Sequence, residues 1–205
     1  MILSVMKKIA INMSPSPDRI FMKSIKNATA SSIIAVIMNR MIKTSYIPDI
    51  LKEARIIFIH KGGESLELDQ WRPITISSVL RRVISKTLDS LMRDLIDLNP
   101  YQRGFLMTPG TFININIVDG ILRTSVAKKQ SACLVFLDVS KAFDSVGHEH
   151  LLSTIEHSQL PHPLQRLLMN MLTNNTTRIQ INGKQTEKLH IKRGVMQGDP
   201  VSPFS

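Results

Sequence analysis

An apolar run that ends in a single carboxylate restricts the choice of folds more than any other segment. Residues 134–137 read Leu-Val-Phe-Leu, and Asp138 follows them directly. Such a run is typical of a buried strand, so we expect a strand over 131–139. An aspartate at the end of a rigid buried strand is well placed to hold a hard cation. A strand-end aspartate can also simply cap the next helix, and for an isolated Asp138 the cap is the better interpretation.

The rest of the chain alternates between helical spacing of apolar residues and short apolar runs. Helices are expected over residues 27–44, 77–95, 112–128, 146–157 and 163–172. Strands are expected over residues 53–60, 71–76, 176–181 and 188–192. Asn182-Gly183 is a hairpin turn signal. This order predicts a mixed α+β fold with an antiparallel element, divided into a helix-rich unit over 1–107 and a sheet-containing unit over 108–205.

Charge and cysteine content narrow the function classes. The net charge is +10, and Lys and Arg outnumber Asp and Glu in both halves of the chain. This favours a polyanionic partner, held in a basic channel rather than by a basic tail. Cys133 is the single cysteine, which excludes an internal disulfide and a cysteine zinc site. No apolar run is long enough for a membrane span or a signal peptide, so we expect a nuclear or cytoplasmic protein that is not secreted.

A second informative segment, which we call the closing motif, spans residues 193–203. It reads Arg-Gly-Val-Met-Gln-Gly-Asp-Pro-Val-Ser-Pro. Gly194 and Gly198 permit close backbone approach and unusual torsions. The amide of Gln197 can donate and accept hydrogen bonds at once, which suits a sugar hydroxyl or the edge of a base pair. A lone pair of glycines is weak support for any function, whereas the whole run is highly specific.

Together, residues 134–146 and 193–203 resemble the reverse transcriptases of non-LTR retrotransposons and group II introns, and their spelling is closest to the R2-type elements. Trp71-Arg72-Pro73-Ile74 and Gln102-Arg103-Gly104-Phe105 match further motifs of that family. The resemblance covers about residues 45–205. It implies a right-hand polymerase fold, with fingers in residues 1–107, the start of the palm in residues 108–205, and no thumb.

The resemblance also implies roles for single residues. Asp138 would be catalytic and would bind Mg²⁺, or Mn²⁺ in its place, together with the backbone carbonyl of Val139. Phe143 would pack beneath the sugar and exclude a 2′-hydroxyl, and Asp144 would be structural. The residues that would bind the nucleotide are Lys61, Arg72, Lys141, Ala142, Phe143, Gln197 and Gly198. Template or primer contacts would come from Arg103 and Gly194. Taken singly, Lys61, Arg72 and Phe143 are better interpreted as structural.

The implied activity is RNA-directed DNA synthesis, with an RNA template, a DNA primer and deoxynucleoside triphosphates as partners. Members of the family carry a second carboxylate site, an aromatic-x-Asp-Asp hairpin after the closing motif. This sequence contains no Asp-Asp dipeptide and ends at Ser205, so we expect a truncated domain that is inactive alone. Two alternatives remain open: an inactive remnant that only binds RNA or primer–template, and a group II intron maturase.

Overall fold

The chain forms two compact units. The computed structural model describes residues 1–11, 20–62, 67, 70–106 and 108–202. One unit comprises residues 1–96 and 141–205, and the other comprises residues 97–140. The division at residue 107 that the sequence suggests concerns functional regions, and it stays a prediction.

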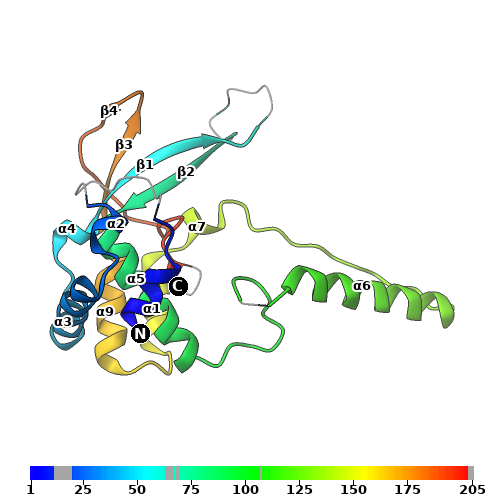
Figure 1. Cartoon of the computed structure of the whole chain (residues 1–205). Helices are drawn as coiled ribbons and strands as arrows, with labels where there is room; N and C mark the ends of the chain where they lie inside the picture. The colour runs from blue at the N-terminus through cyan, green and yellow to red at the C-terminus, as the bar shows by residue number, and fades with distance from the viewer. Residues whose placement is uncertain (12–19, 63–66, 68–69, 107, 203–205) are drawn as a thin grey trace. The chain divides into compact units, whose positions relative to one another are not determined.

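The first unit combines helices with a small sheet (Figure 1). Its helices are α1 (Ile2–Lys8), α2 (Met22–Ile25), α3 (Ala28–Thr44), α4 (Asp49–Lys52), α5 (Val79–Leu95), α7 (Ala142–Ser145), α8 (His148–Glu156) and α9 (His162–Leu172). Its strands are β1 (Glu53–His60), β2 (Trp71–Ser77), β3 (Thr176–Ile181), β4 (Lys184–Gln185) and β5 (Leu189–His190). The predicted α+β class is therefore confirmed.

The sheet is mixed rather than purely antiparallel. β1 lies between β2, with which it pairs antiparallel, and β3, with which it pairs parallel. β4 and β5 both pair antiparallel with β3. Asn182 and Gly183 connect β3 to β4 at φ 48° and 78°, the conformation of a two-residue hairpin turn. The predicted turn is thus confirmed, whereas the parallel pairing needed the tertiary structure.

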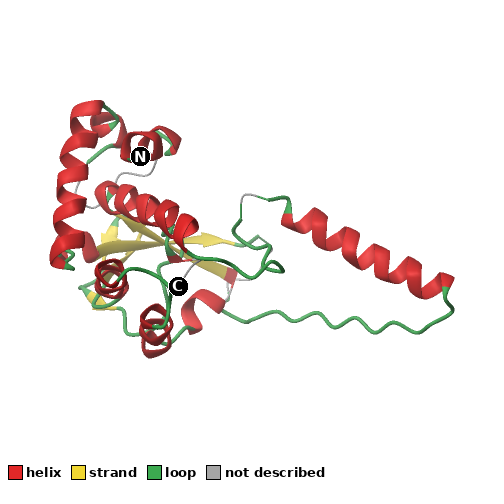
Figure 2. Ribbon diagram, turned by 90° about the horizontal axis from the view of Figure 1, so that it is seen from below, coloured by secondary structure: helices red, strands yellow, loops and turns green. Residues whose placement is uncertain are grey.

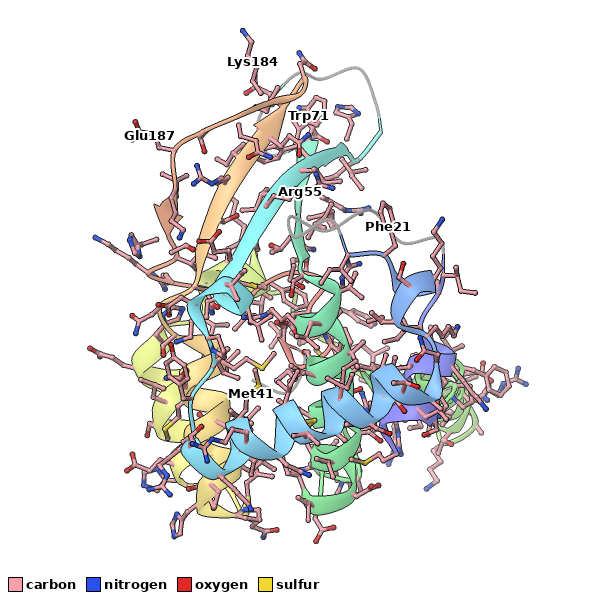
Figure 3. All side chains as sticks on the ribbon, turned by 60° about the vertical axis from the view of Figure 1, so that its left-hand side comes forward. Phe21, Met41, Arg55, Trp71, Lys184 and Glu187 are labelled. Carbon is pink, nitrogen blue, oxygen red and sulfur yellow. The ribbon has the colours of Figure 1, made fainter. Side chains whose placement is uncertain are left out.

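Helix ends and apolar faces explain why the helices form where the sequence predicts them. The side chain of Asn27 accepts a hydrogen bond from the Ala30 amide at 2.8 Å, and Ser78 accepts one from the Arg81 amide at 3.0 Å. These bonds satisfy amides that the first turns of α3 and α5 leave unpaired. The buried faces of α3, α5 and α9 share one apolar cluster, which includes Met41 among the helices in Figure 3. A second cluster joins α1 and α2 to α3 and α5.

The second unit contains one long helix, α6 (Gly110–Ala127). It begins at the buried Gly110, where an added Cβ would lie 2.6 Å from the Arg103 carbonyl oxygen, so only glycine fits there. Several apolar side chains of α6 are exposed, including Phe112 and Val126 at 64% and 79%. Among the residues that the structure describes, no helix has the length and apolar character to cross a membrane.

The strand expected over 131–139 is wrong. In the described part of the chain no strand pairs with this segment, and Figure 2 draws the whole run after α6 as a loop. Phe136 and Leu137 are 81% and 91% exposed. An apolar run becomes a strand only when a neighbour takes up its backbone hydrogen bonds, and composition alone does not supply that neighbour. Asp138 therefore lies on an exposed loop instead of at the end of a buried strand.

Candidate functional site

A cavity of about 360 Å³ collects polar side chains from four separate segments of the first unit. The segments are the end of β1, the start of β2, the beginning of α7 and the closing motif. The cavity is lined by Phe58, Lys61, Trp71, Arg72, Pro73, Lys141, Asp144 and Gln197. A larger cavity of about 600 Å³ lies in the second unit, but its lining is mostly apolar. We take the smaller cavity as the candidate site because several charged groups converge on it.

The β1–β2 pair sets one wall of this cavity. Antiparallel register places Phe58 opposite Pro73 and His60 opposite Trp71. The rings of His60 and Trp71 meet edge to face, with centroids 4.8 Å apart. The Lys61 amide donates to the Gln70 carbonyl at 2.8 Å and closes the pair at its outer end, where Figure 3 shows Trp71. The hairpin therefore fixes where the side chains of Lys61 and Arg72 begin.

The opposite wall begins at a left-handed residue. Lys141 has φ 51° and ψ 42° and immediately precedes α7. Its carbonyl accepts hydrogen bonds from the amides of Asp144 and Ser145, both at 2.9 Å. This tight turn brings Lys141 and Asp144, three residues apart, to the same cavity.

The closing motif is docked onto α7 through its backbone. The Gly194 amide donates to the Val146 carbonyl at 2.8 Å, and the Val195 amide donates to the Phe143 carbonyl at 2.9 Å. Gly194 has φ +81°, and an added Cβ would lie 2.9 Å from the Asp144 Cα. Glycine is therefore required here both for its backbone conformation and for the close approach.

A further backbone contact joins the closing motif to the sheet. The Thr75 amide on β2 donates to the Gln197 carbonyl at 3.2 Å. Gln197 thus lies between β2 and the segment docked on α7, and its side chain lines the cavity. The next residue, Gly198, has φ +102°, a conformation that side chains other than glycine rarely adopt.

The structure brings four of the sequence-predicted residues together, namely Lys61, Arg72, Lys141 and Gln197. Three further predicted residues are sequence neighbours of these four but are not among the residues that line the cavity: Ala142, Phe143 and Gly198. Gly194 contacts protein backbone, and its template or primer role stays a prediction. Asp138, Val139 and the half-buried Arg103 belong to the second unit.

Charge makes the cavity suitable for an anion. Three cationic side chains, Lys61, Arg72 and Lys141, face a single carboxylate, Asp144. The apolar surfaces of Phe58 and Trp71 complete a lining that suits a planar base with a phosphorylated tail. Sequence reasoning missed Phe58 and Asp144 as lining residues. Spacing offers a signal for Asp144, which lies about one helical turn after Lys141, but none for Phe58, because residues three apart on a strand face opposite sides.

The residues predicted to bind a divalent cation supply only some of the oxygen ligands that such an ion needs. Asp138 offers one exposed carboxylate, and Val139 offers a backbone carbonyl. Within the described residues, no three His, Cys, Asp or Glu side chains group into a metal site. Mg²⁺ is often held by one or two carboxylates together with substrate phosphates, so the oxygen donors fit this ion in kind.

Burial perturbs the lysine at the end of α4, directly before β1. Lys52 is 5% exposed, and desolvation lowers its pKa below the ordinary 10.5, an effect that Asp49 partly opposes and Arg81 reinforces. Between the folded-state pKa and 10.5 the unfolded chain binds more protons, so stability rises with pH through that window. Lys52→Met should therefore melt above the wild type at neutral pH, and the difference should shrink toward pH 10.5.

Thermal melts of both proteins at several pH values test this expectation. The exposed Lys43, on α3, provides the control substitution Lys43→Met. A melting difference for Lys52→Met that stays constant up to pH 10.5 would contradict a lowered pKa.

Comparison with known proteins points to one family. Residues 59–205 match the family described as "Reverse transcriptase (RNA-dependent DNA polymerase)". The chain is 35% identical over 197 residues, 96% of its length, to the Retrovirus-related Pol polyprotein from the type-2 retrotransposable element R2DM of Drosophila melanogaster. It is 32% identical over 160 residues, 78% of its length, to the corresponding polyprotein from a type-1 retrotransposable element R2 of Popillia japonica. It is 27% identical over 207 residues to the RNA-directed DNA polymerase from mobile element jockey of Drosophila melanogaster.

These relatives are much longer than this chain. The matched regions span 18% of the R2DM protein and 22% of each of the other two.

Proposed function

Because the chain belongs to the reverse transcriptase family, we propose that it is part of the RNA-directed DNA polymerase of a non-LTR retrotransposon of the R2 type. The observation that carries the proposal is the cavity shared by Lys61, Arg72, Lys141 and Gln197. The family resemblance implied a nucleotide-binding role for all four, and they come from four separate segments. In the polymerase fold that the resemblance implies, the described first unit would contribute most of the fingers and part of the palm.

The proposed reaction joins a deoxynucleotide to a primer. The primer 3′-hydroxyl gives up its proton to water, its oxygen forms a bond to the α-phosphorus, and the bond from that phosphorus to pyrophosphate breaks. Such chemistry asks the protein chiefly for positioning and charge stabilisation. Lys61 and Arg72 would hold the triphosphate, since an arginine fork matches phosphate oxygens and a lysine supplies a mobile charge. Gln197 would orient the sugar or base, and Phe143 would exclude a 2′-hydroxyl.

A divalent cation completes the proposal. As the family resemblance implies, Asp138 and the Val139 carbonyl of the second unit would hold Mg²⁺, an ion that neutralises phosphate charge when bound. Lys141, beside Asp144, would add a further positive charge at the cavity. Arg103 would contact the template or primer backbone, where arginine contacts set register without reading sequence.

Nucleotide binding by the chain gives a direct test of the cavity. Trp71 is the only tryptophan of the sequence and lines the cavity, so its fluorescence should report a titration with deoxyadenosine triphosphate and Mg²⁺. Arg72→Ala and Lys61→Ala should each weaken binding by about 10- to 100-fold, the range expected for losing a charged hydrogen bond. Arg166→Ala, which removes an exposed charge from α9, is the control and should leave the affinity unchanged.

A primer-extension assay separates the polymerase from the second candidate, a nucleic-acid-binding remnant. That candidate draws support from the net charge of +10, which suits binding of nucleic acid without chemistry. The assay uses the chain joined to the aromatic-x-Asp-Asp segment that family members carry after the closing motif. Mg²⁺-dependent extension of a DNA primer on an RNA template by this longer protein, abolished by Asp138→Ala, is the result expected of a polymerase. Salt-dependent binding of primer–template without extension would favour the remnant. Equal affinity of the wild type and the Arg72 and Lys61 variants would contradict the assignment of the cavity.

A further inference from the structure

Arg81 is a charged side chain that the nucleotide cavity does not use directly. It lies on α5 at 2% exposure. Its guanidinium donates to the Asp199 carboxylate at 3.0 Å, to the Leu51 carbonyl and the Asn175 side chain at 3.0 Å each, and to the Met171 carbonyl at 3.1 Å. One buried cation therefore joins α5 to the end of α4, the end of α9 and the closing motif.

The partner carboxylate is held from both sides. Asp199 is 5% exposed at its side chain, and one of its oxygens receives the Arg81 Nε hydrogen bond. The other oxygen accepts from the hydroxyl of Ser85, which lies one turn further along α5. That oxygen and the Ser85 hydroxyl also both accept from the Val201 amide at 3.2 Å. Directional hydrogen bonds to Arg81 and Ser85 thus clamp the end of the closing motif to α5.

This clamp lies two residues from Gln197. The Gln197 carbonyl accepts the Thr75 amide of β2 at 3.2 Å, so the motif has a second anchor on the sheet. Gly198 lies between the two anchors with φ +102°. The Asp199 amide also donates to the Met196 carbonyl at 3.0 Å, which tightens the turn on the other side of Gln197. With both neighbours fixed, the Gln197 backbone, from which its side chain extends, has little freedom to move away from the cavity.

We propose that Arg81 is a positioning residue for the nucleotide site: acting through Asp199, it holds the turn at Gln197 and Gly198 against β2. The inference rests on the proposed function, because it assigns Gln197 to the nucleotide. The competing explanation is that Arg81 only stabilises the core. A buried ion pair contributes little net stability compared with well-packed apolar side chains, whereas its directional bonds can fix a geometry that apolar contacts leave loose.

Two variants of α5 test this role without removing the pocket lining. Ser85→Ala deletes one hydroxyl from the clamp, and Arg81→Lys keeps the charge but loses the planar fork. Arg93→Lys is the matched control, because Arg93 lies on the same helix and pairs with the buried Asp89 instead. Each protein is first checked by circular dichroism and thermal melting, and is then studied well below its melting temperature.

Two readouts distinguish positioning from stability. Amide exchange of Thr75 reports the β2 anchor, and Trp71 fluorescence reports the affinity for deoxyadenosine triphosphate. Ser85→Ala and Arg81→Lys should speed Thr75 exchange and weaken the affinity, by about tenfold for the loss of one oriented buried hydrogen bond. Arg93→Lys should change neither. The double variant Arg81→Lys with Asp199→Asn should lose less nucleotide affinity than the sum of the losses in the two single variants. Both residues act through one contact, so the second change removes little more.

The outcomes separate the two proposals. Folded Ser85→Ala and Arg81→Lys proteins with wild-type affinity would overturn the positioning role and leave the nucleotide site intact. If the affinity losses of Arg81→Lys and Asp199→Asn simply add in the double variant, the positioning role is overturned as well. A wild-type chain that binds no nucleotide would contradict the proposed function itself, and the positioning role would fail with it.

Discussion

Replacing Arg81 by methionine is expected to lower the free energy of unfolding by about 3–5 kcal/mol, the cost of breaking a buried ion pair from one side. The substitution leaves the Asp199 carboxylate buried with its charge uncompensated. It also leaves the carbonyls of Leu51 and Met171 without their guanidinium donors. Denaturant unfolding followed by circular dichroism measures the change.

The control for this prediction is Arg93→Met. Arg93 pairs with Asp89 on α5, but its side chain is 27% exposed, and Asp89 keeps Lys86 as a second partner. The expected loss is therefore only about 1 kcal/mol. Equal losses for the two variants would show that burial and connectivity do not distinguish Arg81 from an ordinary ion pair.

Gly194→Ala is expected to detach the closing motif from α7 and to destabilise the chain by about 2–5 kcal/mol. A left-handed conformation costs a residue with a side chain about 1–2 kcal/mol. The added Cβ would also lie 2.9 Å from both the Asp144 Cα and the Phe143 carbonyl oxygen, and backbone cannot move aside cheaply. Forced overpacking typically adds another 1–3 kcal/mol. Because Asp144 lines the cavity, nucleotide affinity should fall as well.

Gly183→Ala isolates the two contributions to that loss. Gly183 has φ +78°, close to the +81° of Gly194, but nothing lies within 4 Å of its added Cβ. It should therefore show only the conformational cost, and the difference between the variants measures the close approach. Similar losses at the two positions would mean that the contact with α7 contributes nothing.

Local chemistry made much of this fold predictable. Asn27 and Ser78 cap α3 and α5 as their residue types suggest, because their side-chain oxygens satisfy the first free amides. The strand over 53–60 was also predicted with the right bounds. The prediction for residues 131–139 failed, because an apolar run and a paired strand differ only in having a hydrogen-bonding neighbour. The short helix α1 was missed, since its lysines and apolar residues give no capping signal.

The candidate site divides in the same way. The family resemblance implied nucleotide-binding roles for Lys61, Arg72, Lys141 and Gln197. Their residue types suit those roles, because cations bind phosphate and an amide can serve a sugar or base. Their convergence depends on contacts between distant segments, such as the Thr75 amide bond to Gln197. Spacing offered a signal for Asp144 alone. The place of Phe58 and Asp144 beside the cations followed from the register of β1 and the turn at Lys141.

By itself, the sequence determined the family through its motifs and most of the helices through their spacing, since both depend on residue type and short-range order. The ligand class that the family implies stays a proposal. Only the tertiary structure decided that β1 pairs parallel with β3, that Arg81 reaches Asp199, and that Gly194 must lie against Asp144. Each of these contacts joins residues far apart in the chain. Local sequence does not specify which distant residues will contact one another, because those contacts form only when the whole core packs.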